Sequence, residues 1–521
     1  MIRRKAEGQR DEGSLLENTI IELQTSGKLS HLTDPGQYGR THDEQLFSVA
    51  LELCITWVNR ILFLKLLESQ LVKYHRGDRA YAFLNSAKLA DFDEVYRLFF
   101  RVLARRPAER QGGVRQKFGK VPYLNSSLFE ITELEDTTLS INTLDSSLSL
   151  PLLRQSVLRD HPAYRDRAEL PALGYLFAFL DAYDFASESG DDIQEKNRAL
   201  INASVLGLIF EKINGYKDGS FYTPGFITEY MCRETIRRAV VQKFNDAHGW
   251  RCADFAALRD KDLDRPRANA LIDSLRICDP AVGSGHFLVS ALNELIAIKS
   301  ELGILQDDAG RRLKGYLIRV VNDELVVLDE EDDEPFTYFL QEATGKPTAE
   351  RQRVQRVLFH EKQVLIENCL FGVDINPNSV KICRLRLWIE LLKNAYYTEE
   401  SGFAELETLP NIDINIKQGN SLLSKFSLTE DLSDVFRKQR FSLQTYRSAV
   451  AAYKNTADKD AKAELLRFIH DIKGQFRETV INRDPRRKRL SAKRGERMLL
   501  DNNFDIFGKP IKDPKLVAVE K

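Results

Sequence analysis

The sequence predicts an α/β protein in which a mostly helical N-terminal domain precedes a domain built on a parallel sheet. Residues 43–74 form one long helical pattern with apolar side chains almost all round it, which indicates a helix buried on several sides. Residues 275–278 are a short apolar run that is followed by a glycine-containing turn and then by helical periodicity from residue 289. A strand, a glycine turn and a helix in this order are typical of the first unit of a nucleotide-type α/β site.

The other elements follow from periodicity and turn residues. We expect residues 1–40 to be loosely helical with a turn at Pro35-Gly36, a helical pair over 78–104, a basic loop over 105–120, short strands and loops over 131–160, helices over 175–183, 200–212, 227–244 and 379–396, and two charged helices over 430–480. The predicted domains are 1–200, helical; 201–430, the sheet domain; and 431–521, a helical hairpin with a basic C-terminal segment.

An insertion is expected inside the sheet domain. The carboxylates of Asp279 and Asp374 lie 95 positions apart. A compact strand–helix–strand unit places its second acidic residue only about 20 positions after the glycines. The excess is assigned to residues 300–362, where two β-branched runs flank Asn322-Asp323 and predict a β-hairpin.

Composition excludes several classes of protein. Lys and Arg number 76 against 77 Asp and Glu, so any nucleic-acid contact must come from a local basic patch. The six cysteines form no Cys-x-x-Cys pair and no metal-binding spacing, which favours free thiols in a reducing cytoplasm. The charged N-terminus has no apolar core after it, and the apolar run 46–67 is interrupted by charges, so neither a signal peptide nor a membrane span is expected.

The turn at 279–285, Asp-Pro-Ala-Val-Gly-Ser-Gly, is the first candidate site. Gly283 and Gly285 allow a sharp turn and a close approach of a ligand to the backbone. The spacing is not that of a dinucleotide fingerprint, and no Gly-Lys-Ser/Thr follows to hold a triphosphate. An acidic residue at the strand end favours a cationic or hydroxyl-bearing ligand over a phosphate.

Residues 279–288 resemble the S-adenosylmethionine-binding motif of adenine-N6 DNA methyltransferases, specifically the gamma-class, TaqI-like enzymes of restriction–modification systems, including their large type IIG-like members. Three more segments resemble that class in its own order: 221–231 (Phe-Tyr-Thr-Pro-Gly-Phe-Ile-Thr-Glu-Tyr-Met), 370–377 (Leu-Phe-Gly-Val-Asp-Ile-Asn-Pro) and 416–423 (Ile-Lys-Gln-Gly-Asn-Ser-Leu-Leu). The resemblance implies a partial Rossmann-like, S-adenosylmethionine-dependent methyltransferase domain.

The resemblance also implies a set of cofactor-binding residues. Asp374 would accept hydrogen bonds from the ribose hydroxyls, Asn420 would meet the adenine edge, and the segment around Thr223 would contact the methionine end. The full set implied for S-adenosyl-L-methionine is Tyr222, Thr223, Pro224, Asp279, Pro280, Ala281, Gly283, Ser284, Gly285, Asp374, Ile375 and Asn420.

The catalytic motif of this family, Asn/Asp/Ser-Pro-Pro-Tyr/Phe, is absent, since the chain contains no Pro-Pro dipeptide. In the family that motif hydrogen-bonds the adenine amino group and stacks on the flipped base. No catalytic residue is therefore assigned. The sequence predicts the cofactor-binding part of a methyltransferase, incomplete without a downstream catalytic half or a second chain that supplies the motif and the target-recognition region.

The segment 483–497 is the candidate DNA contact, with eight Lys or Arg among its fifteen residues. The residues assigned to phosphate contact are Arg486, Arg487, Lys488, Arg489, Lys493 and Arg494. The alternative is a charged run that only faces solvent.

Two other functions stay open on this evidence. One is a non-catalytic subunit that binds S-adenosylmethionine or DNA; the other is methylation of protein or small-molecule acceptors, which the segment around Thr223 disfavours by resemblance. No nuclease constellation and no metal site can be assigned, because carboxylates and lysines are too abundant for loose spacings to carry meaning.

Overall fold

The computed structural model describes residues 10–185 except 33 and 125–126, residues 223–423 except 411, residues 441–481 except 457–458, and positions 205, 209, 489, 490, 492 and 493. The chain divides into two compact units, residues 1–423 and 424–521. The sequence placed this second boundary at 430/431. The division at residue 200 stays a prediction.

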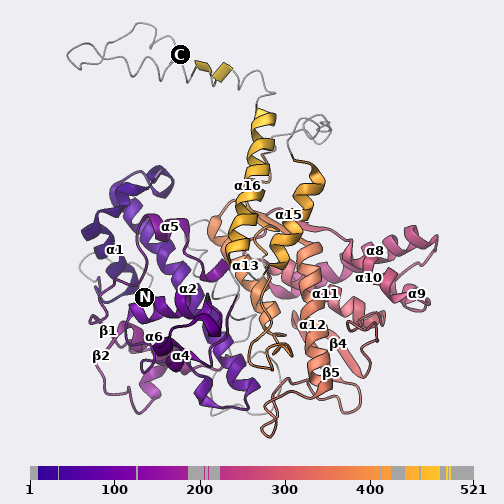
Figure 1. Ribbon diagram of the computed structural model, residues 1–521, viewed down its shortest axis with the longest axis horizontal. Helices are drawn as coiled ribbons and strands as arrows, with labels where there is room; N and C mark the ends of the chain where they lie inside the picture. The colour runs from indigo at the N-terminus through magenta and orange to yellow at the C-terminus, as the bar shows by residue number, and fades with distance from the viewer. Residues whose placement is uncertain are drawn as a thin grey trace. The chain divides into compact units, whose positions relative to one another are not determined.

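The helices of the first unit are α1 (Leu15–Ser26), α2 (His42–Tyr74), α3 (Phe92–Arg97), α4 (Gly112–Phe118), α5 (Glu133–Thr137), α6 (Ala172–Asp181), α8 (Gly225–His248), α9 (Phe255–Arg259), α10 (Arg265–Asp273), α11 (His286–Glu301), α12 (Ala349–Asn368) and α13 (Pro377–Leu392). Its strands are β1 (Ser149–Pro151), β2 (Glu169–Pro171), β3 (Ile277–Asp279), β4 (Tyr316–Val321), β5 (Glu324–Asp329), β6 (Leu370–Asp374) and β7 (Ile416–Gln418). Figure 1 shows their arrangement.

Helix α2 begins and ends where the sequence predicts a long buried helix. A capping box starts it: the Thr41 hydroxyl accepts from the Glu44 amide, and the Glu44 carboxylate accepts from the Thr41 amide. It is long and apolar enough to cross a membrane, but 72% of its most apolar window is buried inside the protein. Its C-terminal Tyr74 hydroxyl donates to the carbonyl of Ala395. The helix is therefore a core element that joins the N-terminal part to the sheet domain.

Strands β3, β6 and β7 form a parallel sheet in the order β3-β6-β7. Ile277 pairs with Leu370, and Gly372 pairs with Ile416. The prediction that residues 275–278 and 370–373 are neighbouring parallel strands is confirmed. Because all three strands point the same way, the segments that follow them meet at one edge of the sheet.

The connection from β3 to β6 carries the predicted insertion. Helix α11 leaves β3, the hairpin β4–β5 follows, and α12 returns to β6. Asn322 and Asp323 have φ of 53° and 64° at the hairpin turn, the left-handed conformation that a two-residue turn of this type requires. The predicted hairpin is confirmed.

Helices α8, α11 and α12 pack beside the sheet (Figure 1). Arg237 on α8 pairs with Glu294 and Glu301 on α11, which keeps the two helices parallel along their length. The predicted helices over 227–244 and 379–396 are present as α8 and α13. Two short helices, α1 and α5, form where the sequence predicted loose structure; Ser14 and Thr132 cap their first turns.

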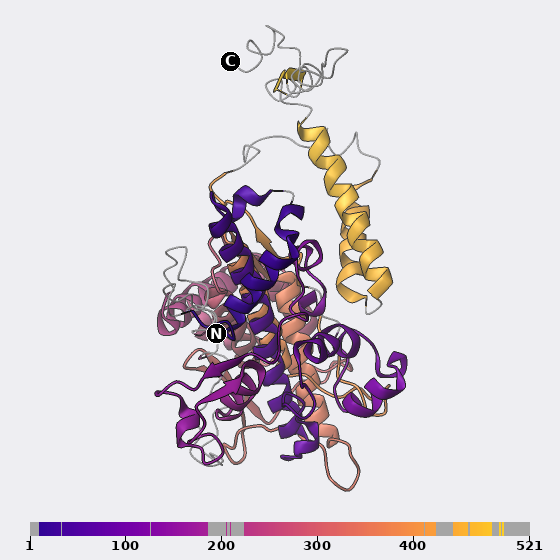
Figure 2. The ribbon, with the colours of Figure 1, turned by 90° about the vertical axis from the view of Figure 1, so that its left-hand side faces the viewer.

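The described part of the second unit is a pair of helices, α15 (Leu443–Asn455) and α16 (Lys459–Ile481), that lie side by side (Figure 2). Phe441 and Phe468 pack edge to face with ring centroids 5.0 Å apart. The predicted helical hairpin over 430–480 is present within the described residues.

Candidate cofactor site at the carboxyl edge of the sheet

The turn after β3 is locked onto the end of β6. The Gly283 amide donates to Asp374 Oδ2 at 2.8 Å, and the Val282 amide donates to the Val373 carbonyl at 2.9 Å. Gly283 and Gly285 have φ of 52° and 84°, where a side chain would be strained. The structure thus brings together the two acidic segments that lie 95 positions apart in the sequence.

Asp374 holds two loops with one carboxylate. Its Oδ1 accepts from the Asn376 amide at 2.8 Å, while Oδ2 accepts from Gly283. A carboxylate has about four acceptor positions, so two remain for a ligand. Ile375, the next residue, is 68% exposed and presents an apolar surface beside the carboxylate. A hydroxyl-bearing ring with a flat apolar part fits this pair.

The segment after β7 reaches the same edge. The Gly419 amide donates to the Asp374 carbonyl at 2.8 Å, and the Ser421 hydroxyl donates to the Pro280 carbonyl. Asn420 lies between them, exposed, with its Oδ1 accepting from the Leu422 amide at 3.0 Å. Its amide Nδ2 is the donor that stays available to a ligand. The structure therefore places Asn420 beside the turn at 279–285, as the resemblance requires.

Two carboxylates give this edge a negative character. Burial raises the pKa of Asp279, and the neighbouring Asp374 charge acts in the same direction, against the hydrogen bond from the Ala281 amide. Such an edge favours a ligand that carries positive charge. This agrees with the sequence-based expectation of a cationic or hydroxyl-bearing ligand.

The start of helix α11 is tightly packed beneath the turn. A Cβ on Gly285 would come within 2.7 Å of Cys383 Sγ, so glycine is required there for helix packing as well as for the turn. Ser284 is buried, and its hydroxyl accepts from Arg386 Nη1 at 3.3 Å. Pro280 and Ala281 are exposed on the ligand side.

Thr223 and Pro224 immediately precede helix α8. A buried polar cluster fixes that end of the helix: Ser290 Oγ donates to Asp323 Oδ1 at 2.6 Å and lies 2.9 Å from Thr228 Oγ1. The Asp323 amide donates to Glu229 at 2.9 Å. Tyr222 lies outside the described residues, as do Arg486, Arg487, Lys488 and Arg494 of the basic segment; Arg489 and Lys493 are exposed.

Sequence reasoning missed Asp323, Ser290 and Arg386. The Asn322-Asp323 pair was recognised as a turn, but turns usually lie at the surface. Here Asp323 is 6% exposed, because the hairpin tip inserts between α8 and α11. No local pattern reveals that burial; an alternating hairpin whose tip carries a carboxylate is the most that the sequence shows.

The burial of Asp323 gives a prediction about pH. Burial raises its pKa to about 6; the Ser290 hydrogen bond and the charges of His286 and Arg386 oppose the shift, and Glu390 adds to it. A carboxyl with a raised pKa binds its proton more tightly when folded, so stability falls as pH rises from about 4 to about 6. Across that window Asp323→Asn should remove on the order of 3 kcal/mol of the pH dependence of unfolding. Urea unfolding at pH 4.5 and 7 checks this; identical pH dependence in parent and variant would contradict it.

Comparisons with known proteins agree with this site. Residues 258–448 match the family model described as the MmeI DNA-methyltransferase domain, and residues 1–201 match a domain of unknown function, DUF7814. The sheet, the turn at 279–285 and Asp374 all lie within the first match. The class is thus that of a DNA-methyltransferase domain, and the resemblance predicted from the sequence is confirmed.

The relatives are restriction–modification proteins. The chain is 29% identical over 408 residues to a putative type II restriction enzyme and methyltransferase of Methanocaldococcus jannaschii, covering 73% of this chain and 28% of that protein. It is 28% identical over 109 residues to the type II restriction enzyme and methyltransferase RM.Eco57I of Escherichia coli, covering 21% of this chain and 11% of that protein. The chain therefore spans less than a third of the length of these relatives.

A solved structure is also similar. The type IIL restriction–modification enzyme MmeI in complex with DNA matches 86% of this chain and 46% of its own, with 14% identity and a TM-score of 0.36.

Proposed function

We propose that this protein is the cofactor-binding part of a site-specific adenine-N6 DNA methyltransferase of a restriction–modification system. The observation that carries the proposal is the Asp374 carboxylate, held at the end of β6 by the Gly283 amide of the glycine turn after β3. The family match and the names of the relatives support the methyltransferase class and DNA as the partner. We extend this to a partial Rossmann-like domain on the parallel order β3-β6-β7.

The residues present fit S-adenosyl-L-methionine. When bound, it would supply an electrophilic methyl group on a positively charged sulfonium. The exposed acceptors of Asp374 suit the ribose hydroxyls, and Ile375 and Asn420 suit the face and edge of the adenine. The backbone at Gly283 permits close approach, and Thr223 and Pro224 on α8 are placed for the methionine end. The acidic edge at Asp279 suits the cationic part of the molecule.

The acceptor base would be oriented by groups outside these residues. The adenine amino group is a weak nucleophile because its lone pair is delocalised into the ring. A hydrogen-bonding motif that localises this pair and aligns the nitrogen with the methyl group contributes a large part of the catalysis. No Pro-Pro dipeptide is present to build the family's version of it. A further segment or a second chain would supply it.

The activity prediction follows from this division. Residues 1–521 alone are expected to bind the donor and yet show no methyl transfer to DNA. Extruding a base from the duplex costs a few kcal/mol, which a binding pocket must offset. Tritium transfer to duplex DNA is the assay, with and without the polypeptide encoded downstream. Robust transfer by residues 1–521 alone would refute the half-enzyme proposal.

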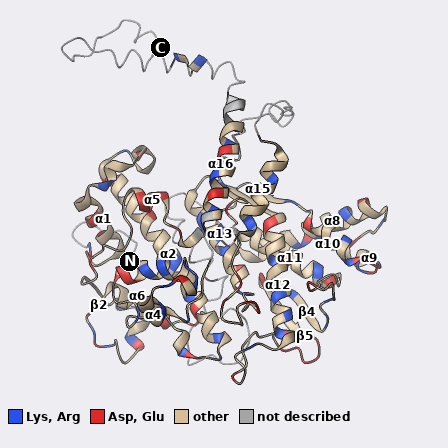
Figure 3. Cartoon of the chain, in the orientation of Figure 1, with Lys and Arg blue, Asp and Glu red and all other residues tan. Residues whose placement is uncertain are grey.

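The alternative proposal is a non-catalytic subunit that binds S-adenosylmethionine or DNA, favoured by the absence of the Pro-Pro motif. It predicts donor binding without transfer under any condition, including addition of the downstream polypeptide. In either case we propose that Arg489 and Lys493, with Arg486, Arg487, Lys488 and Arg494, contact DNA phosphates. Lys or Arg and Asp or Glu are otherwise interspersed over the chain (Figure 3), so a local patch has to carry this contact. The six cysteines are free thiols, which suits a reducing cytoplasm.

A further inference from the structure

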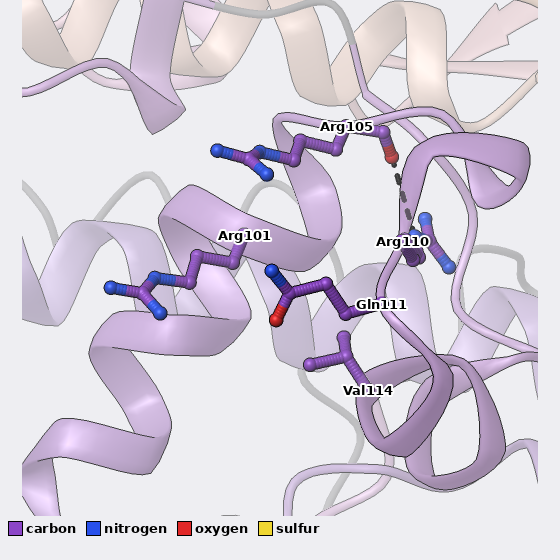
Figure 4. A pocket seen from close by; sticks show the side chains of 5 residues that line it. All are labelled: Arg101, Arg105, Arg110, Gln111 and Val114. Atoms are coloured by element: carbon purple, nitrogen blue, oxygen red, sulfur yellow. Dashed lines mark hydrogen bonds between the residues drawn. The ribbon is translucent and has the colours of Figure 1, made fainter.

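A hollow lined by arginines lies in the N-terminal part of the chain, apart from the residues of the cofactor site. It lies between the π-helical turn Leu98–Leu103, the loop that follows and helix α4, and has a volume of about 290 Å³. Arg101, Arg105, Arg110, Gln111 and Val114 line it (Figure 4). Residues 101–120 contain seven Lys or Arg and one Glu, so the surroundings of the hollow are strongly basic.

Arg110 is the fixed wall of this hollow. It is only 5% exposed, and its guanidinium donates to three backbone carbonyls: Nε to Arg105 at 3.3 Å, and Nη1 to Phe118 at 3.1 Å and Val121 at 2.7 Å. These bonds tie the loop to the end of α4 and define its shape. The arginine side of the hollow is therefore preorganised.

The buried charge of Arg110 has no counter-ion among the described residues. No carboxylate there lies within 4.0 Å of its guanidinium, and its Nη2 is buried without a hydrogen-bond partner in that part of the chain. A buried cation costs several kcal/mol unless an anion compensates it. Burial lowers its pKa to about 10, so the group stays charged at neutral pH. An anion in the adjoining hollow would provide this compensation.

Arg101 and Arg105 offer the accessible donors. Both are exposed, and neither forms an ion pair within the described chain. Nearby cations are already engaged: Lys117 pairs with Glu94 at 2.9 Å and Lys120 with Asp78 at 3.4 Å. Figure 4 shows the guanidinium groups of Arg101 and Arg105 extending to the same side as the Gln111 amide. Planar guanidinium forks match the oxygens of a phosphate group.

We infer that this hollow is a phosphate-binding site, with Arg101, Arg105 and Gln111 as donors and Arg110 as the fixed positive wall. The phosphate belongs either to the DNA backbone or to a free phosphate-bearing small molecule. The first source rests on the proposed function, and the second does not. The site lies in the region matched only by a family of unknown function, residues 1–201.

The test uses the full chain and two charge-matched double variants. Arg101→Gln/Arg105→Gln removes the two accessible donors, both on exposed side chains whose loss should leave the fold intact. Arg154→Gln/Arg251→Gln removes two exposed arginines elsewhere. Inorganic phosphate is titrated calorimetrically at constant ionic strength, and duplex DNA binding is followed by fluorescence anisotropy at several salt concentrations. Binding of S-adenosylmethionine by each variant is measured in parallel.

We expect the first variant, but not the control, to bind phosphate at least tenfold more weakly. If the phosphate is a DNA backbone phosphate, the slope of log affinity against log salt should also fall by about 0.9. Weaker phosphate binding with an unchanged slope assigns the site to a free ligand, while a lower slope alone assigns it to DNA. Equal phosphate binding and equal slopes in the parent and both variants would overturn the inference, whether or not the chain binds S-adenosylmethionine.

Discussion

Asp374→Ala is expected to weaken the binding of S-adenosyl-L-methionine at least tenfold. The carboxylate is placed to accept hydrogen bonds from two ribose hydroxyls while it holds the Gly283 and Asn376 amides. Hydrogen bonds to a charged group are worth about 1.5–3 kcal/mol each, so the loss of even one corresponds to this factor. Equilibrium dialysis with the tritiated donor measures it.

Three companion variants separate ligand contact from structural damage. Asp374→Asn keeps the shape and one acceptor and should give an intermediate affinity. Gly283→Val should abolish binding by a different route, because a β-branched residue is strained at φ 52° and fills the approach to the backbone. Asp246→Ala removes an exposed carboxylate far along α8 and should bind like the parent. If Asp374→Ala and Gly283→Val both bind the donor normally, the site is misplaced.

Arg60→Met is expected to lower the free energy of unfolding by about 3–5 kcal/mol, the usual cost of leaving one partner of a buried ion pair alone. Arg60 is 1% exposed on α2; its Nη2 donates to Glu135 Oε2 at 2.9 Å, and its Nε donates to the Leu128 carbonyl at 2.7 Å. Burial raises the pKa of Glu135, but the hydrogen bonds and charge of Arg60 outweigh it, and the net pKa lies below its usual value.

The double variant Arg60→Met/Glu135→Leu is the informative control. Replacing both charges with apolar groups of similar size is often close to neutral, so most of the lost stability should return. Urea unfolding followed by circular dichroism gives both values. A single variant within 1 kcal/mol of the parent would show that the pair does not stabilise this part of the fold.

The sequence predicts those features that depend on local pattern. Helix α2, the ends of β3 and β6 and the hairpin turn at Asn322-Asp323 all follow from periodicity, β-branched runs and turn residues. The meeting of Asp374 with Gly283 is also predictable, because the carboxyl ends of parallel strands share one edge of the sheet.

Features that depend on contacts between distant residues are not predictable in this way. The Arg60–Glu135 pair joins positions 75 residues apart, and Asp323 reaches Ser290 across 33. The arginine hollow was visible only as a basic loop, since burial of Arg110 depends on how α4 packs. Helix α1 escaped prediction because its Ser14 cap precedes a segment of mixed polarity.

The central claim is that the carboxyl edge of the sheet β3-β6-β7 binds S-adenosyl-L-methionine. Isothermal titration of residues 1–521 with S-adenosyl-L-homocysteine tests it most directly. The expected result is saturable binding of one molecule per chain, lost in Gly283→Val and unchanged in Asp246→Ala. Absence of any saturable binding by the folded parent chain would contradict the account.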